Sequence, residues 1–275
     1  MSIEQKIDSN FEISLLKRTR WVGMHDSHFH NGYELYYLLE GEVYYFIENA
    51  VYSVKKGDMV LIPRNLIHKT SSRNKPDCKR VLISFQDSFV FDMLKYDKNL
   101  LDCFNLRIIS LSKQNKKTLE NIIGKLLNEF GGIYEPNYAL IKALLCELLI
   151  LLCRNVGNDE LKNSVQIDNI TSQKIIEVVE YINKEYKQDI TLEMLAKQFY
   201  MSSAYLSRLF KKVTGFHYSE YLTNVRIKQA VYLLSNSNYN VTQIALNTGY
   251  NSSNHFCKSF KSVMGISPLK YKRRV

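Results

Sequence analysis

The chain has 275 residues, of which 45% are hydrophobic, so it is long enough for two domains of ordinary size, each with its own core. Its five cysteines are widely spaced and form no Cys-x-x-Cys pair, which argues against a disulfide framework or a cysteine-based zinc site. The net charge of +10 is unevenly placed: residues 171–275 hold 15 Lys and Arg against 6 Asp and Glu, whereas residues 1–170 hold 22 against 21. A basic segment beside a nearly neutral one is typical of a protein that binds a polyanion, although charge alone also fits a solvated surface.

The beginning of the chain, MSIEQKIDSNFEIS, lacks the apolar segment of a secretory signal, and with the cysteine pattern this predicts a cytoplasmic protein. Residues 11–90 favour short β-strands, because β-branched and aromatic residues alternate with turn signals such as Asn31-Gly32 and Gly57-Asp58. The expected strands are Tyr33–Leu39, Val43–Ile47, Val51–Val54, Met59–Ile62 and Val81–Phe85. Many short strands at this spacing predict a small barrel or sandwich.

Two segments within these strands carry histidines at regular positions, HFHNGYELYYLLEG at 28–41 and GDMVLIPRNLIH at 57–68. Together they resemble the two cupin motifs, which are matched here by His28, His30, Glu34, Gly41, Gly57, Pro63 and His68. Two positions depart from the motif: Asn65 stands where glycine is usual, and Ser72 where asparagine is often found. The resemblance implies a cupin-type β-barrel.

The histidines leave two interpretations open. Because His28 and His30 are two residues apart, they face the same way on one strand, and with Glu34 and His68 they would bind Fe, Mn, Ni or Zn. Alternatively, no cofactor is bound, and the same residues hydrogen-bond a small effector in the mouth of the barrel. In that case five further residues would line the pocket and stack on a sugar ring or another flat face: Trp21, His25, Tyr36, Tyr44 and Phe46. Aromatic residues of this kind are equally typical of a core.

Two apolar helices follow, predicted at Lys116–Phe130 and Asn137–Arg154. They form an antiparallel pair that packs on the first domain or on a second subunit, so we expect a homodimer. The most apolar stretch, Ala139–Cys153, is interrupted by charged residues and is shorter than the ~20 residues of a membrane span. The polar residues 156–170 are interpreted as a linker between domain 1–155 and domain 171–275.

The remaining residues favour helices throughout, at 172–186, 191–198, 203–212, 218–234, 241–247 and 253–263, with Thr191 capping the second of these. Within them lies a repeat: SSAYLSRLFKKVTG at 202–215 and SSNHFCKSFKSVMG at 252–265 align without gaps at an offset of 50 residues. Each copy follows a short helix and a tight turn, and the second turn is one residue longer, with Gly249 at its bend. This is helix-turn-helix geometry, whose second helix fits a major groove ~12 Å wide, although a single such unit would equally fit a generic helical hairpin.

The ordered set of both units, the joining helix with VRIKQAVYLL and the ending ISPLKYKR resembles the AraC/XylS family of bacterial transcription regulators over residues 172–273. The resemblance implies that the exposed faces of the two recognition helices read bases. Those positions are Ser203, Ala204, Ser207 and Arg208 in the first helix and Ser253, Asn254, Cys257 and Lys258 in the second. Among them Arg208 suits guanine and Asn254 suits adenine, while phosphate contacts are expected from Lys211, Lys212 and Lys261.

The predicted fold is α+β with two domains, an N-terminal cupin-type β-barrel with a helical pair and a C-terminal all-α domain with two helix-turn-helix units. The predicted function is an effector-controlled, DNA-binding regulator, an activator that contacts RNA polymerase and has no catalytic residues. Two alternatives remain: a metal-dependent cupin enzyme with a nucleic-acid-binding tail, and a protein that binds nucleic acid without sequence preference.

Overall fold

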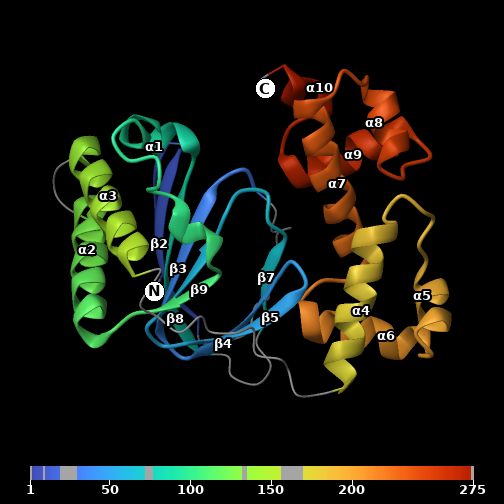
Figure 1. Cartoon of the computed structure of the whole chain (residues 1–275), viewed down its shortest axis with the longest axis horizontal. Coiled ribbons are helices and arrows are strands. Elements are labelled where there is room, and N and C mark those ends of the chain that lie inside the picture. Colours follow the sequence, from blue (N-terminus) through green and yellow to red (C-terminus); the bar gives the residue numbers. More distant parts are fainter. Residues whose placement is uncertain are drawn as a thin grey trace.

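In the computed structural model, residues 2–8, 10–18, 30–71, 77–131, 135–155 and 170–273 are described. Strands dominate the first part of the chain and helices the last part, which confirms the mixed class of the predicted fold (Figure 1). No helix within these ranges is both long and apolar enough to cross a membrane.

Within the described residues, nine strands form two antiparallel sheets. The larger sheet has the order β1-β2-β8-β3-β6-β9, and the smaller has the order β5-β4-β7. The strands of the larger sheet are β1 (Ser2–Asp8), β2 (Phe11–Arg18), β8 (Cys78–Phe85), β3 (Tyr33–Glu40), β6 (Asp58–Ile62) and β9 (Ile108–Ser110). Those of the smaller sheet are β5 (Ala50–Lys55), β4 (Glu42–Ile47) and β7 (His68–Ser71). Buried side chains from both sheets, including Leu38, Tyr45 and Ile62, pack together between them.

Helices cover the other face of the larger sheet (Figure 1). They are α1 (Asp87–Leu94), the 3-10 helix η1 (Asp102–Asn105), α2 (Lys113–Gly131) and α3 (Tyr138–Arg154). Leu35 and Tyr37 of β3 point toward them and share a core with α2 and α3, because alternate residues of a strand face opposite sides. The predicted helical pair is therefore present, and Asn137 caps α3 by accepting a hydrogen bond from the Leu140 amide at 3.0 Å.

The last part of the described chain folds as seven helices around one core. They are α4 (Ile170–Glu185), α5 (Leu192–Gln198), α6 (Ser203–Thr214), α7 (Tyr218–Asn236), α8 (Val241–Asn247), α9 (Ser253–Met264) and α10 (Pro268–Lys272). The first six agree with the predicted helices to within a few residues, whereas α10 was not predicted. Thr191 caps α5 as predicted, accepting from the Met194 amide at 3.1 Å.

The predicted linker 156–170 lies outside the described residues except for Ile170, which already begins α4. The core of the C-terminal helices also extends into the strands. Phe46, Val51 and Ile67 are buried in it, so β4, β5 and the residues before β7 pack directly against the helical part.

Candidate functional site

Helix α6 presents one polar face opposite its buried face. Leu206, Phe210 and Val213 are buried in the core, which fixes the orientation of the helix. The opposite face carries the residues that the sequence assigned to DNA contact: Ala204, Arg208, Lys211 and Lys212 are exposed, and Ser203 and Ser207 are half-buried. Ser202 caps the helix by accepting from the Tyr205 amide at 3.3 Å.

Helix α9 repeats this arrangement. Phe256 and Phe260 are buried. On the other side Ser253, Asn254, Lys258 and Lys261 are exposed and Cys257 is half-buried. Ser252 accepts from the His255 amide at 3.5 Å, in the same role as Ser202 in α6. Both helices also end on a glycine in the left-handed region, Gly215 with φ 81° and Gly265 with φ 72°.

The turns before α6 and α9 have the same hydrogen bonds. In the first, the Tyr200 amide donates to the Lys197 carbonyl at 3.4 Å and the Met201 amide to the Ala196 carbonyl at 2.8 Å. In the second, the amides of Gly249 and Tyr250 donate to the carbonyls of Leu246 and Ala245 at 3.1 and 3.0 Å. The second turn is one residue longer, as predicted, and Gly249 at its bend has a φ of 84°. The two helix pairs therefore share the hydrogen bonds of their turns and the caps of their second helices.

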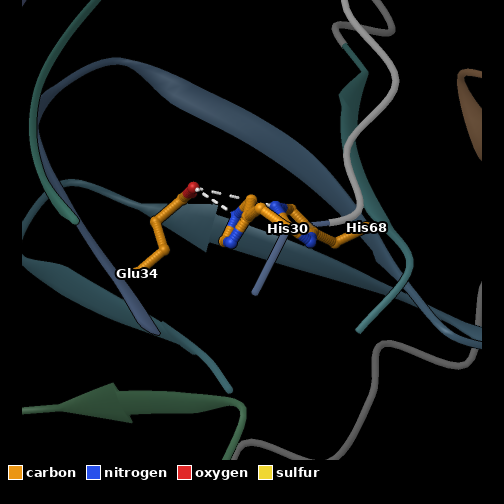
Figure 2. Close-up of side chains that lie close together, drawn as sticks. All are labelled: His30, Glu34 and His68. Carbon is orange, nitrogen blue, oxygen red and sulfur yellow. Dashed lines mark hydrogen bonds and ion pairs between the residues drawn. The ribbon is translucent and has the colours of Figure 1, made fainter. Parts of the chain in front are cut away.

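A second group of candidate functional side chains lies between the two sheets (Figure 2). Glu34 on β3, His68 on β7 and His30, just before β3, offer ligand atoms that all lie within 4.8 Å of one another. Glu34 Oε2 lies 3.2 Å from His30 Nε2 and 3.7 Å from His68 Nε2. The other carboxylate oxygen accepts a hydrogen bond from the hydroxyl of Tyr45 on β4, at 3.0 Å. These residues are called the Glu34 cluster below.

Backbone carbonyls fix the tautomers of both rings in the Glu34 cluster. His30 Nδ1 lies 3.0 Å from the Gly32 carbonyl, and His68 Nδ1 lies 2.7 Å from the Leu66 carbonyl. Since a carbonyl only accepts, each Nδ1 must carry its hydrogen and donate. Each Nε2 faces the Glu34 carboxylate. In a neutral ring this atom carries a lone pair, which would repel the carboxylate, so a favourable contact requires either a proton on Nε2 or a cation bound between the two groups.

Burial and charge act in opposite directions on these groups. Burial alone would raise the pKa of Glu34, but hydrogen bonds from His30 and His68 outweigh it and hold the pKa well below its ordinary value. For His30, burial lowers the pKa, but the hydrogen bond to Glu34 and the charge of Glu34 together raise it by more, so the net shift of the pKa is upward. Burial and the nearby Glu34 charge raise the pKa of Tyr45 well above its ordinary value. Glu34 is thus a buried carboxylate that stays ionised.

The predicted pocket residues are only partly brought together. Tyr36 lies among the buried residues between the two sheets, beside Tyr45 of the Glu34 cluster, and its lining role stays a prediction. Phe46 and Tyr44 were wrongly predicted to line the same space, because both pack against the core of the C-terminal helices. The residue between them, Tyr45, points inward instead. Trp21, His25 and His28 lie outside the described residues, as does Ser72.

Two further details concern the histidine motifs. His30 precedes β3 rather than lying on a strand, so the predicted same-strand geometry of His28 and His30 is wrong for His30. Asn65, which replaces the usual glycine, has a φ of 59°. Asparagine tolerates the left-handed region better than most residues, so the turn before β7 can accept Asn65 in place of glycine.

Three residues were missed by the sequence analysis. Tyr45 completes the Glu34 cluster, and the periodic pattern concealed it because aromatic residues flank it. Arg80 is buried on β8, donates to Ser14 Oγ at 3.1 Å and lies 5.6 Å from the ring centre of Tyr36. Tyr200 is 93% exposed in the turn before α6, in the left-handed region with a φ of 56°.

Comparisons with known proteins agree with both halves of the chain. Residues 195–274 match the family model described as a helix-turn-helix domain, and residues 34–164 match the ExsA N-terminal regulatory domain. The uncharacterized HTH-type transcriptional regulator YijO of Escherichia coli is 30% identical over 242 residues, which cover 86% of this chain and 80% of YijO. The uncharacterized HTH-type regulator YdeC of Bacillus subtilis is 24% identical, covering 90% of this chain and 85% of YdeC. The HTH-type transcriptional activator RhaR of Mannheimia succiniciproducens is 23% identical, covering 90% and 87%.

Proposed function

The chain belongs to the AraC/XylS family of DNA-binding transcription regulators, and we propose that it binds promoter DNA through α6 and α9 under the control of a small molecule bound at the Glu34 cluster. The observation that carries the proposal is the repeated helix pair. The second helix of each pair, α6 or α9, has the same kind of cap, the same hydrogen bonds in the turn before it and an exposed polar face. Both helices lie within the basic part of the chain. A generic helical hairpin would not require this repetition.

In this proposal α5–α6 and α8–α9 are two helix-turn-helix units. Arg208 reads guanine through bidentate hydrogen bonds and Asn254 reads adenine, and the other exposed or half-buried residues of the two faces support them: Ser203, Ala204, Ser207, Ser253, Cys257 and Lys258. Lys211, Lys212 and Lys261 hold phosphates. Because Ala204 is small where Asn254 is polar, the two units read unequal halves of one site.

The N-terminal part is proposed to be a cupin-type sensor domain, with residues 1–155 as the sensor, 156–170 as the linker and 171–275 as the DNA-binding domain. Its effector is a small polar molecule, such as a sugar, held by the Glu34 cluster, Tyr36 and Arg80. These groups offer a carboxylate acceptor, tyrosine hydroxyls and a guanidinium donor in a largely buried space, which suits a ligand with several hydroxyl or carboxyl groups. Trp21, His25 and His28 stay predicted members of this site. The site acts as a sensor and not as a catalytic centre.

A divalent metal ion is a second candidate occupant, favoured by the orientation of the two rings. Two ligand atoms on a tetrahedral zinc ion are about 3.4 Å apart, and Glu34 Oε2 lies 3.2 and 3.7 Å from the two Nε2 atoms. Metal-bound histidines typically donate the other ring N–H to a carbonyl, as His30 and His68 do here. A bound ion would supply, in place of a proton, the positive charge between the Glu34 carboxylate and the two rings.

Titration calorimetry of the metal-free full chain with Zn²⁺ or Mn²⁺ tests the metal. One ion bound per chain, with binding lost in Glu34→Gln and His30→Ala, is expected, and unchanged binding in both variants would refute these ligands. If the metal-bound protein also converted a substrate, the alternative of a metal-dependent enzyme would be favoured.

We further propose that the protein is a cytoplasmic homodimer that pairs through α2 and α3 and activates transcription by contacting RNA polymerase.

Sequence-specific DNA binding is tested by measuring the affinity of the full chain for genomic fragments recovered from cells and for random DNA, at several salt concentrations. The recovered fragments are expected to bind at least about 1,000-fold more tightly than random DNA. Equal affinity at every salt concentration would mean binding without sequence preference.

A further inference from the structure

The ribbon formed by β4 and β7 separates the Glu34 cluster from the C-terminal helices. Tyr45 and His68 point from this ribbon toward Glu34. The next residue on each strand, Phe46 and Lys69, faces the opposite side, because side chains alternate across a strand. Phe46 and Lys69 are also direct cross-strand partners. A single layer of backbone therefore lies between the cluster and the helices.

The outer side of this ribbon is bound tightly to the region where α7 begins. Lys69 Nζ lies 2.8 Å from Glu220 Oε1 and 4.5 Å above the ring of Phe216, and its side chain is only 8% exposed. The ring centre of Phe46 lies 6.2 Å from that of Phe216 and 5.8 Å from that of Tyr221. Because the Lys69 ammonium is buried, removing Glu220 would leave a buried charge without its partner, which is costly.

These contacts act on the junction between α6 and α7. Glu220 also accepts the His217 amide at 3.3 Å and so caps α7. Gly215, which ends α6, lies so close to the ribbon that a Cβ placed there would be 3.2 Å from Lys69 Cγ. The exposed face of α6, with Ala204 and Arg208, remains uncovered. The ribbon therefore positions the first recognition helix without hiding it.

We propose that the β4–β7 ribbon transmits the state of the Glu34 cluster to α6: an occupant that draws Tyr45 or His68 away from Glu34 changes how firmly Phe46 and Lys69 hold the α6–α7 junction. This inference rests on the proposed sensor function and names the contacts through which binding at the Glu34 cluster would affect α6. Glu34 is the branching point, since one carboxylate oxygen binds Tyr45 on β4 and the other faces His68 on β7. An effector acts through this route only by binding the two arrangements of the ribbon with different affinity.

Hydrogen–deuterium exchange of the full chain tests the route without a ligand or DNA. Glu34→Gln and Tyr45→Phe each remove an interaction on the inner side of the ribbon, the side that faces away from the C-terminal helices. Exchange of the amides from Gly215 to Tyr221 is expected to rise about 3-fold to 10-fold in both variants. The matched control is Lys79→Met, which removes a cation 3.9 Å from Glu40 on the sensor strands and should leave these amides unchanged.

If Glu34→Gln does not fold, Tyr45→Phe decides alone, since it removes a single hydroxyl. Exchange that rises in β3 and β4 but not in residues 215–221 would overturn the proposal. In a Lys69→Met background the effect of Tyr45→Phe should shrink, and fully additive effects would show that Lys69 is not on the route. None of these arms uses DNA or an effector, so a failure of sequence-specific DNA binding would sink the proposed function and leave the route standing.

Discussion

The two helix pairs reach the same turn geometry with different residues at the bend. Tyr200 and Gly249 both lie in the left-handed region and donate the same turn hydrogen bond. Tyr200 is 93% exposed, so its side chain has room. At Gly249 a Cβ would lie 2.8 Å from the Tyr186 carbonyl oxygen and 3.0 Å from Arg226 Nε. The neighbours, more than the backbone angle, decide where the chain needs glycine.

The pairs also differ in what holds them. The end of α6 is packed against the N-terminal strands through Lys69, whereas a Cβ on the corresponding Gly265 of α9 would have no atom within 4 Å. The second pair is clamped from within the C-terminal helices: Arg226 on α7 donates to the Tyr186 carbonyl at 2.8 Å and lies 5.4 Å from the ring centre of Tyr250. Signals from the sensor should therefore reach the first pair before the second.

The largest effect is expected from Gly249→Ala. The added methyl combines left-handed strain with a clash against backbone, which should destabilise the second pair by about 3 kcal/mol. Native-state hydrogen exchange of the amides in α9 measures this loss. Gly265→Ala is the matched control, because its φ is similar and its surroundings are open. If both variants cost the same, the neighbours of Gly249 are not what demands glycine.

Breaking the clamp should come next. Arg226→Met keeps much of the apolar stem but removes the hydrogen bonds to the carbonyls of Tyr186 and Gln188, at a cost of about 2 kcal/mol. The loss should appear in the exchange of α8 and α9 and leave the amides of α6 nearly unchanged. Equal losses in both pairs would mean that they are not held independently.

The DNA contacts sharpen the comparison from the side of function. Arg208→Ala should cost about tenfold in affinity and relax the preference at one base position in one half of the site. Lys212→Ala serves as the cationic control and should weaken binding to all sequences alike. Affinities for a set of single-base variants of the bound site measure both. A uniform loss for Arg208→Ala would remove its role in reading a base.

The smallest effect is expected at the bend of the first pair. Tyr200→Gly should relieve left-handed strain and stabilise the fold by about 1 kcal/mol, visible as a higher midpoint of thermal unfolding. A lower midpoint would show that the exposed ring makes a stabilising contact. The sign should be opposite to that of Gly249→Ala, although both substitutions change the same position of the turn.

The sequence predicted the helical part well because its signals are local. The caps at Thr191, Ser202 and Ser252 and the glycines that end α6 and α9 each act within a few residues of the chain, so they are visible in one sequence. The short helix α10 was missed because five residues give too little periodicity.

The strands were harder to predict where both faces are covered. In β4, EVYYFI, Tyr45 faces the space between the two sheets and Phe46 faces the C-terminal helices. Because both sides are apolar, no alternation marks the inward face, and Tyr44 and Phe46 were assigned to the wrong side. Arg80 was missed for a related reason: a lone arginine on a strand is normally a surface residue, and its burial depends on strands that are distant in the sequence.

The central claim is that both helix pairs contact one asymmetric DNA site. Selection of binding sites from randomised DNA by the full chain tests it most directly. The account predicts an enriched motif with two unequal halves, centred about 10 base pairs apart, in which Arg208→Ala erases the preference in one half and Asn254→Ala in the other. A motif with only one specified half, or no enrichment over random DNA, would contradict it.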